Sequence, residues 1–320
     1  MKVKIIFFIL FLSLLTIVKA EVNFVTVSNE KNYNSIKDFT NTYEINLNKH
    51  GSKEIIKCQA VRLAKNWFIT AAHCVKDTCD NGSCSFQARL IVGPNYEADF
   101  TTTNGKKLSK KIFTFSKTKL NKTELLYDIA LIYFDPKETK TIFKDPLNKR
   151  YLNEAEFMRR IPNKIAYLRA LNGTHLPPIL VINKESPIVL KKDLSVISIQ
   201  SGKKELLKNS DAPIFYSPKL SNIITRNFGI IKGISGSGVM TNTGELVGIL
   251  SAKAELKSSR FSASIPLVYI APFDKEIMAF ILKHIPNVAY KEADKKTYRA
   301  LTEQEEKDLK IIENVKFNLE

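Results

Sequence analysis

The chain has 320 residues, 44% of them hydrophobic and 25% charged, and its formal net charge is +17 at pH 7. This length exceeds what one compact core usually needs and is enough for two. The charge favours contact with acidic proteins or anionic surfaces, but lysines are interleaved with acidic residues and no nucleic-acid-binding motif occurs, so a specific nucleic-acid-binding protein is excluded.

The first 20 residues are predicted to be a secretory signal peptide. Lys2 and Lys4 give a positive start, an apolar core follows, and the small residue Ala20 ends the segment. A retained membrane anchor is the alternative, although the apolar run is shorter than the ~20 residues that span a bilayer. No later segment is long and apolar enough to cross one. We therefore expect a secreted or periplasmic protein whose mature chain begins at Glu21 and has no stable membrane span.

Residues 21–150 are predicted to form an antiparallel β-barrel. Their apolar residues come in short runs separated by turn formers, which is the spacing of a closed antiparallel sheet. The clearest runs are 57–63, 86–92, 111–115 and 129–134.

All four cysteines lie in this first unit, and in an exported chain they indicate disulfides rather than reduced thiols. Cys58 and Cys74 are 16 residues apart on consecutive apolar segments that could pair as neighbouring antiparallel strands. Cys79 and Cys84 flank an Asn-Gly turn signal and could form a short local bridge. A zinc site built from these cysteines and His73 is the alternative, although the spacing fits no standard ligand pattern.

Residues 151–286 are predicted to form a second β-barrel. A charged bridge over 135–162, with a short helix at 153–160, separates it from the first. The apolar runs of the second unit are 164–171, 178–182, 193–200, 239–241, 245–251 and 260–267.

The chain ends in a predicted helix and a charged tail. Over 272–284 the apolar period becomes that of a helix, which stops at Pro286 and should dock on the second barrel. Residues 287–320 are mostly charged. Within them Thr302-Glu303-Gln304-Glu305 is a capping-box sequence that could begin a short helix ending near Glu313. A frayed or loosely packed helix is favoured over a functional tail, because it offers little apolar surface.

Three polar residues stand where catalysis could use them. His73 ends the apolar segment Trp-Phe-Ile-Thr-Ala-Ala-His-Cys-Val, Asp128 heads the run Asp-Ile-Ala-Leu-Ile, and Ser235 lies within Gly-Ile-Ser-Gly-Ser-Gly. Their spacings are 55 and 107 residues. A serine hydroxyl is a poor nucleophile at neutral pH, so it needs a base, and that base needs an anion to orient it. These residue types together indicate nucleophilic catalysis.

The order and the three local motifs resemble those of the trypsin/chymotrypsin-like serine peptidases, over about residues 43–286. The resemblance implies an all-β fold of two antiparallel six-stranded β-barrels with a C-terminal helix, and an enzyme that needs no cofactor or metal. It also implies a bridge between Cys58 and Cys74, which closes the loop behind the histidine.

The resemblance also assigns roles. Ser235 would attack the peptide carbonyl, His73 would carry the proton to the leaving amine, and Asp128 would orient His73. The backbone N–H groups of Gly233 and Ser235 would form the oxyanion hole, in a turn that Gly233 and Gly236 permit.

Other residues of these types carry weaker signals. Ser237 has no glycine two positions before it, so Ser235 is the preferred nucleophile. Asp128 could simply cap a strand, but Asp135, the nearest competitor, precedes a proline and is interpreted as a strand end. No motif surrounds the remaining histidines, which are expected at surface or edge positions: His50, His175 and His284.

Two departures from the family pattern matter. Many members hold an Asp directly before the nucleophile, where a newly cut N-terminus pairs with it, and this chain has Ile234. No Ile-Val-Gly-Gly segment occurs near the start either. The chain therefore resembles bacterial-type members that fold directly into an active form, and its oxyanion turn must be held by other means. Selection for Lys or Arg needs an acid six residues before the nucleophile, where this chain has Gly229, so tryptic cleavage is not expected.

Substrate contacts are expected on two segments. By resemblance, Ser251, Ala252 and Lys253 would pair with an extended peptide or protein substrate as an added strand. Lys232, Lys253 and Arg260 weakly favour acidic residues in that substrate.

The leading function is thus an exported serine endopeptidase that works through an acyl-enzyme intermediate. The alternative is a catalytically silent homologue that binds a host or envelope polymer through its basic surface, since fold does not determine function. An ester or lipid hydrolase is opposed by the order of the three residues.

Overall fold

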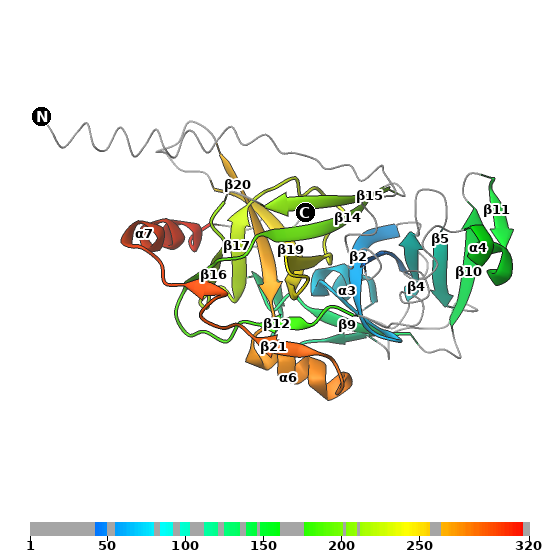
Figure 1. Ribbon diagram of the computed structural model, residues 1–320, viewed down its shortest axis with the longest axis horizontal. Coiled ribbons are helices and arrows are strands. Elements are labelled where there is room, and N and C mark those ends of the chain that lie inside the picture. The colour runs from blue at the N-terminus through cyan, green and yellow to red at the C-terminus, as the bar shows by residue number, and fades with distance from the viewer. Residues whose placement is uncertain are drawn as a thin grey trace, which may run out of the picture.

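Two β-sheets dominate the computed structural model of the chain (Figure 1). The structure describes residues 42–49, 55–79, 84–91, 97–102, 112–120, 125–134, 139–145, 148–160, 176–200, 203–209, 212–256 and 264–315. The predicted signal peptide lies outside these residues. No helix within them is long and apolar enough to span a membrane.

The first sheet has nine strands in the order β11-β10-β5-β4-β1-β2-β3-β9-β6. Its strands are β1 (Thr42–Lys49), β2 (Ile55–Ala64), β3 (Trp67–Thr70), β4 (Cys84–Ile91), β5 (Glu97–Thr102), β6 (Ile112–Thr114), β9 (Ala130–Tyr133), β10 (Thr139–Asp145) and β11 (Arg150–Leu152). Every pairing in it is antiparallel. Successive side chains of a strand point to opposite faces of the sheet. In β1 the apolar residues Tyr43, Ile45 and Leu47 therefore share one face, and all three are fully buried.

The second sheet has eleven strands, nine of them in the order β15-β14-β18-β19-β20-β17-β16-β13-β22, while β12 pairs with β19 and β21 pairs with β12. Its strands are β12 (Ile179–Val181), β13 (Ile188–Leu190), β14 (Leu194–Gln200), β15 (Lys203–Asn209), β16 (Phe215–Ser217), β17 (Asn222–Arg226), β18 (Gly238–Thr241), β19 (Leu246–Leu256), β20 (Ile265–Pro272), β21 (Tyr290–Glu292) and β22 (Tyr298–Arg299). The strands β7 (Lys119–Leu120) and β8 (Leu125–Leu126) pair with each other in a separate two-stranded sheet.

The prediction of an all-β fold with two barrels is confirmed, and short strands extend the sheets beyond six strands each. Several predicted runs correspond to strands, while run 164–171 lies outside the described residues. The strands that were not predicted include β13, β15, β16 and β17 of the second unit and β21 and β22 of the tail. Two more, β10 and β11, lie within the predicted bridge 135–162, which therefore extends the first sheet instead of only separating the two units.

One buried cluster joins the two barrels. It contains Ile69 and Leu131 from the first sheet together with Met240, Ile249 and Phe273 from the second unit. Because this cluster is continuous, the ends of β3, β9 and β19 are held against one another. The candidate catalytic residues lie beside these strands, His73 in helix α3 (Ala72–Cys79) and Asp128 and Ser235 in loops.

Four helices complete the described chain: α3 (Ala72–Cys79), α4 (Glu154–Arg160), α6 (Lys275–His284) and α7 (Glu303–Ile312). The helix predicted at 153–160 is confirmed, with Asn153 Oδ1 accepting from the Glu156 N–H at 2.8 Å.

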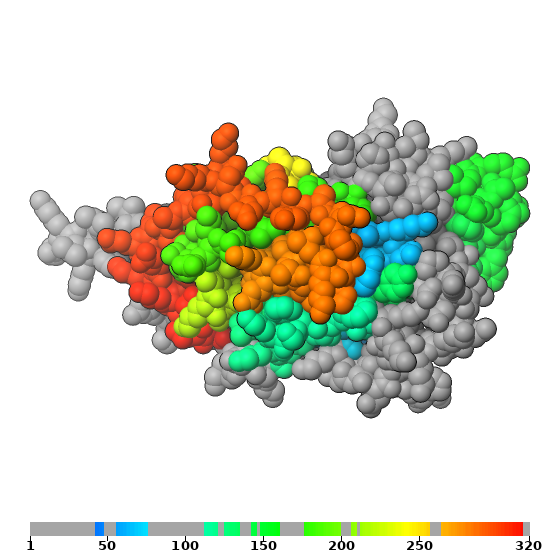
Figure 2. All heavy atoms as spheres, turned by 90° about the horizontal axis from the view of Figure 1, so that it is seen from below, coloured from blue at the N-terminus to red at the C-terminus, as the bar shows by residue number. Residues whose placement is uncertain are grey.

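The C-terminal helix α6 forms where its apolar period predicted it, but docking on the second barrel alone is wrong. Figure 2 shows it, in orange, lying against residues of the first barrel in teal and blue. Phe280 packs on Phe115 with ring centroids 5.5 Å apart, and His284 packs on Phe113 at 4.4 Å. His284 is thus half-buried in an aromatic cluster rather than a plain surface residue.

The charged tail is folded, so its interpretation as a frayed segment is wrong. The capping box forms as predicted, with Thr302 and Glu305 bonded reciprocally at the start of α7. The side chains of Leu309 and Ile312 are buried against the second barrel. Strand β21 pairs with β12 and β22 pairs with β13, so the tail extends the second sheet.

Candidate active site

His73 and Asp128 meet because their strands are neighbours. Thr70, the last residue of β3, pairs with Ala130, the first residue of β9. The chain leaves β3 into α3 and enters β9 from the segment that holds Asp128, so both side chains lie at the same edge of the sheet. His73 Nδ1 is 2.7 Å from Asp128 Oδ2.

A second bond reinforces this pair. The backbone N–H of His73, in the first turn of α3, donates to Asp128 Oδ1 at 2.8 Å. First-turn N–H groups of a helix have no partner within the helix, and the positive helix end favours a carboxylate. Asp128 therefore binds both the ring and the backbone of His73, which limits rotation of the imidazole.

The Asp128 carboxylate is buried, at 1% exposure. Burial alone would raise the pKa of this carboxyl, but the charge of His73 and the hydrogen bonds from His73 and Ser251 outweigh it and hold the pKa below its ordinary value. The Ser251 hydroxyl donates to Oδ2. An ionised, immobile carboxylate is what an imidazole base requires to stabilise its protonated form.

Ser235 lies in a turn that only glycine allows. Gly233 has φ +92° and Gly236 has φ +86°, both in the left-handed region. A Cβ at Gly236 would lie 2.0 Å from the carbonyl oxygen of Gln59, so the turn sits directly on β2. The Gln59 N–H donates to the Ser235 carbonyl oxygen at 2.7 Å, and Gly236 N donates to Leu250 O at 2.8 Å.

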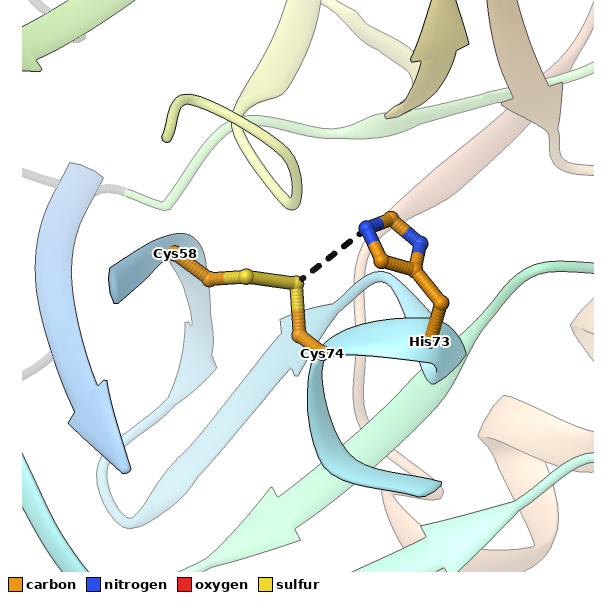
Figure 3. Close-up of side chains that lie close together, drawn as sticks. All are labelled: Cys58, His73 and Cys74. Carbon is orange, nitrogen blue, oxygen red and sulfur yellow. Dashed lines mark hydrogen bonds between the residues drawn. A yellow bond between two sulfur atoms is a disulfide. The ribbon is translucent and has the colours of Figure 1, made fainter. Parts of the chain in front are cut away.

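The disulfide predicted between Cys58 and Cys74 forms, and Figure 3 shows it beside the His73 ring. Cys74 Sγ is 3.7 Å from His73 Nε2 and 3.9 Å from the carbonyl oxygen of Ser235. Since a disulfide sulfur carries no hydrogen, these are packing contacts. His73 and the Ser235 backbone therefore rest on the same sulfur atom.

His73 and Asp128 are in direct contact. The Ser235 backbone lies against the same sulfur atom as the His73 ring, so all three predicted catalytic residues gather at one place in the fold.

Cys58, His73 and Cys74 place potential metal-binding atoms within 4.8 Å of one another. Zinc binds thiolates, and neither sulfur of a disulfide is one. The zinc interpretation is therefore wrong for Cys58 and Cys74. The predicted bridge between Cys79 and Cys84 lies outside the side chains that the structure describes, and it stays a prediction.

The predicted substrate-pairing segment is on β19. There Ala252 and Lys253 pair with Tyr269 and Val268 of β20. The pairing of β18 with β19 ends at Ile249, and no other described strand pairs with the segment beyond it on that side. Within the part of the chain that the structure describes, that backbone edge has no paired strand, which is what the addition of a substrate strand requires.

The other predicted substrate residues lie beside the turn. Gly229, at φ +97°, is half-buried, Lys232 is exposed, and Arg260 lies outside the described residues. The Ser251 side chain has a role that the sequence analysis missed, since it binds Asp128. Gln59 was missed as well, because a lone glutamine in a strand carries no motif.

Residues 35–154 match the family model described as Trypsin. The matched residues hold His73 and Asp128, so over this part the chain is similar to the trypsin family. No curated protein matches the sequence.

Three solved structures are similar to this chain. The scabies mite inactivated protease paralogue S-I1 has 12% identity and a TM-score of 0.44, with 78% of this chain and 95% of that one covered. A Glu endopeptidase in complex with MPD has 14% identity and a TM-score of 0.47, with 84% and 99% covered. The tobacco etch virus protease complexed with product has 11% identity and a TM-score of 0.43, with 79% and 80% covered.

Proposed function

We propose that this chain is an exported serine endopeptidase in which Ser235, His73 and Asp128 form the catalytic triad. The observation that carries the proposal is the contact between His73 Nδ1 and the buried Asp128 carboxylate, 2.7 Å long. It leaves Nε2, the other ring nitrogen, facing the side on which Cys74 and the Ser235 turn lie. A half-exposed histidine held in this way is suited to act as a general base.

The proposed reaction has two stages. Ser235 Oγ attacks the peptide carbonyl carbon while His73 Nε2 accepts the hydroxyl proton, and Asp128 stabilises the imidazolium. His73 then gives that proton to the leaving amine, the C–N bond breaks, and an ester remains on Ser235. In the second stage His73 takes a proton from water, the resulting hydroxide attacks the ester, and Ser235 recovers its proton as the acid product leaves.

The substrate is proposed to be an extended peptide. It would add to the open edge of β19 at Ser251 to Lys253, which sets its register through backbone hydrogen bonds. Lys232 and Lys253 are exposed near this path and would favour acidic side chains in the substrate.

Export is proposed from the signal-peptide pattern of the first 20 residues, and the disulfide between Cys58 and Cys74 supports it. Disulfides persist mainly in oxidising compartments. N-terminal sequencing of the protein recovered outside the cytoplasm should begin at Glu21, and an uncleaved N-terminus would contradict processing.

Peptide hydrolysis tests the proposal. Wild-type protein should cleave a fluorogenic peptide library and react with a fluorophosphonate probe, Ser235→Ala should do neither, and Ser186→Ala, which changes an exposed serine, should match wild type. Equal cleavage by Ser235→Ala would contradict the assignment.

A silent homologue that binds a polymer through its lysines is the second candidate. The feature that favours it is Ile234, which stands where many family members hold the acid that shapes the oxyanion turn. Failure of the wild-type protein to cleave peptides or to take up the probe, with its fold intact, would support this candidate.

A further inference from the structure

Gln59 of β2 is a fully buried side chain that links three segments. Its Nε2 donates to the Ile199 carbonyl oxygen of β14 at 2.9 Å, and its Oε1 lies 2.8 Å from Ser237 Oγ. Its backbone N–H binds the Ser235 carbonyl oxygen, as described above. One residue of the first barrel is thus inserted between a strand of the second barrel and the turn that carries Ser235.

Ser237 forms hydrogen bonds with the peptide group that links Ile234 to Ser235. Its hydroxyl oxygen lies 2.6 Å from the Ile234 carbonyl oxygen, and its backbone N–H donates to the same oxygen at 3.1 Å. The single hydroxyl proton is shared between this carbonyl and Gln59 Oε1, while the Ser237 N–H supplies a second donor to the carbonyl. The Ile234 carbonyl is therefore restrained on two sides.

A restrained carbonyl orients the N–H across the same peptide. In a trans peptide the C=O and the following N–H point in opposite directions within one plane. Fixing the Ile234 oxygen towards Ser237 therefore fixes the Ser235 N–H in the opposite direction. That N–H is one of the two donors assigned to the oxyanion hole.

The side chain of Ile234 anchors the same peptide. It is fully buried in the second-barrel core, in the cluster that contains Val239, Leu250 and Val268. This is the position at which many family members hold an acid that pairs with a cut N-terminus. An isoleucine cannot form that ion pair, but it contributes apolar burial that holds the backbone in place.

We propose that Gln59 and Ser237 are positioning residues that hold the Ile234–Ser235 peptide in the orientation of a working oxyanion hole, with buried Ile234 as the apolar anchor. The turn then needs no proteolytic cut to become active. This inference rests on the proposed peptidase function. It explains how a chain without the usual acid keeps its nucleophile turn in place.

The test distinguishes residues that orient the oxyanion hole from residues that only stabilise the fold. Ser237→Ala removes only the hydroxyl, and Gln59→Leu removes the amide at similar volume. For a cleaved peptide amide, kcat should fall about 10- to 100-fold in both variants, less than the loss expected for removing an oxyanion donor outright, while KM stays within about twofold. The inhibition constant of a matching peptide aldehyde, whose adduct places an oxyanion in the hole, should rise in parallel.

Thr225→Val is the matched control, because it removes a buried hydroxyl of β17 that bonds Pro213 O and Asn209 Nδ2, neither of which belongs to the turn. It should lower stability but leave kcat unchanged. Unchanged kcat and aldehyde affinity in Ser237→Ala would overturn the inference even if Gln59→Leu fails to fold. An inactive wild-type protein would instead overturn the proposed function, and the inference with it.

Discussion

Ser251 and His73 bind the same carboxylate oxygen of Asp128, one through its hydroxyl and the other through Nδ1 at 2.7 Å. These contacts come from the two barrels, since Ser251 lies on β19 and His73 follows β3. The acid of the candidate site is therefore held by both halves of the molecule. Its ionisation and orientation depend on the packing between them.

Replacing Ser251 should weaken catalysis moderately. Ser251→Ala removes a hydrogen bond to a charged group, which is worth roughly 1.5–3 kcal/mol, so kcat/KM should fall about 10- to 100-fold. The lost bond should also raise the pKa of Asp128, measurable by NMR titration of its carboxyl carbon. Ser186→Ala is the control, and a Ser251→Ala enzyme that matches it in both measurements would show that the bond has no role in catalysis.

Replacing either glycine of the turn by alanine should lower stability, but by different amounts. Gly233→Ala meets no atom within 4 Å, so it should cost only the left-handed strain, roughly 1–2 kcal/mol by urea unfolding. Gly236→Ala should cost more, because the new Cβ would overlap Gln59 O and push the turn off β2. A shift of about 1 Å at the nucleophile can cost about 100-fold in rate. Equal stability of the two variants would contradict the docking of the turn on β2.

The disulfide should stabilise both barrel and site. Its cysteines are 16 residues apart, and a loop of this length is worth about 3 kcal/mol in the chain-entropy description. The double variant Cys58→Ala/Cys74→Ala should lose about this much stability in urea unfolding, together with activity, because the bridge packs against His73. Full activity in the reduced or substituted protein would contradict the packing role.

The C-terminal tail should loosen in acid. Arg299 donates two hydrogen bonds to Glu305, at 2.6 and 2.7 Å, and these bonds lower the pKa of that carboxyl to about 2 from an ordinary 4.5. A pKa lowered by folding gives stability that is complete above pH 4.5 and is lost as the pH falls towards 2. Hydrogen exchange of α7 should therefore speed up over this range.

Glu305→Gln should remove that acid dependence and make α7 exchange faster at pH 7. Glu303→Gln is the matched control, since it changes an exposed acid in the same helical turn. An α7 exchange rate independent of pH in the wild-type protein would show that the Arg299 pair does not hold the tail.

The features that the sequence predicted correctly are those that depend on short sequence motifs. The helix α7 formed where its capping box indicated, because a capping box is satisfied within four residues. The contact of His73 with Asp128 followed from two long motifs that resembled a known family. The disulfide between Cys58 and Cys74 followed from the same resemblance.

Contacts between the barrels could not be predicted in this way. Gln59 reaches Ile199, 140 residues away, and only the packing of two sheets brings these residues together. The apolar face of α6 indicated burial but not its partner, so Phe113 of the first barrel was missed as the residue against which His284 packs. Such partners depend on tertiary register rather than on periodicity.

The mass and site of a fluorophosphonate adduct provide the sharpest check on the catalytic assignment. The intact wild-type protein should gain one adduct, located by peptide sequencing on Ser235, and His73→Ala should react far more slowly while keeping its fold. An adduct on Ser237 or another serine, or equal labelling of His73→Ala, would show that His73 does not activate Ser235.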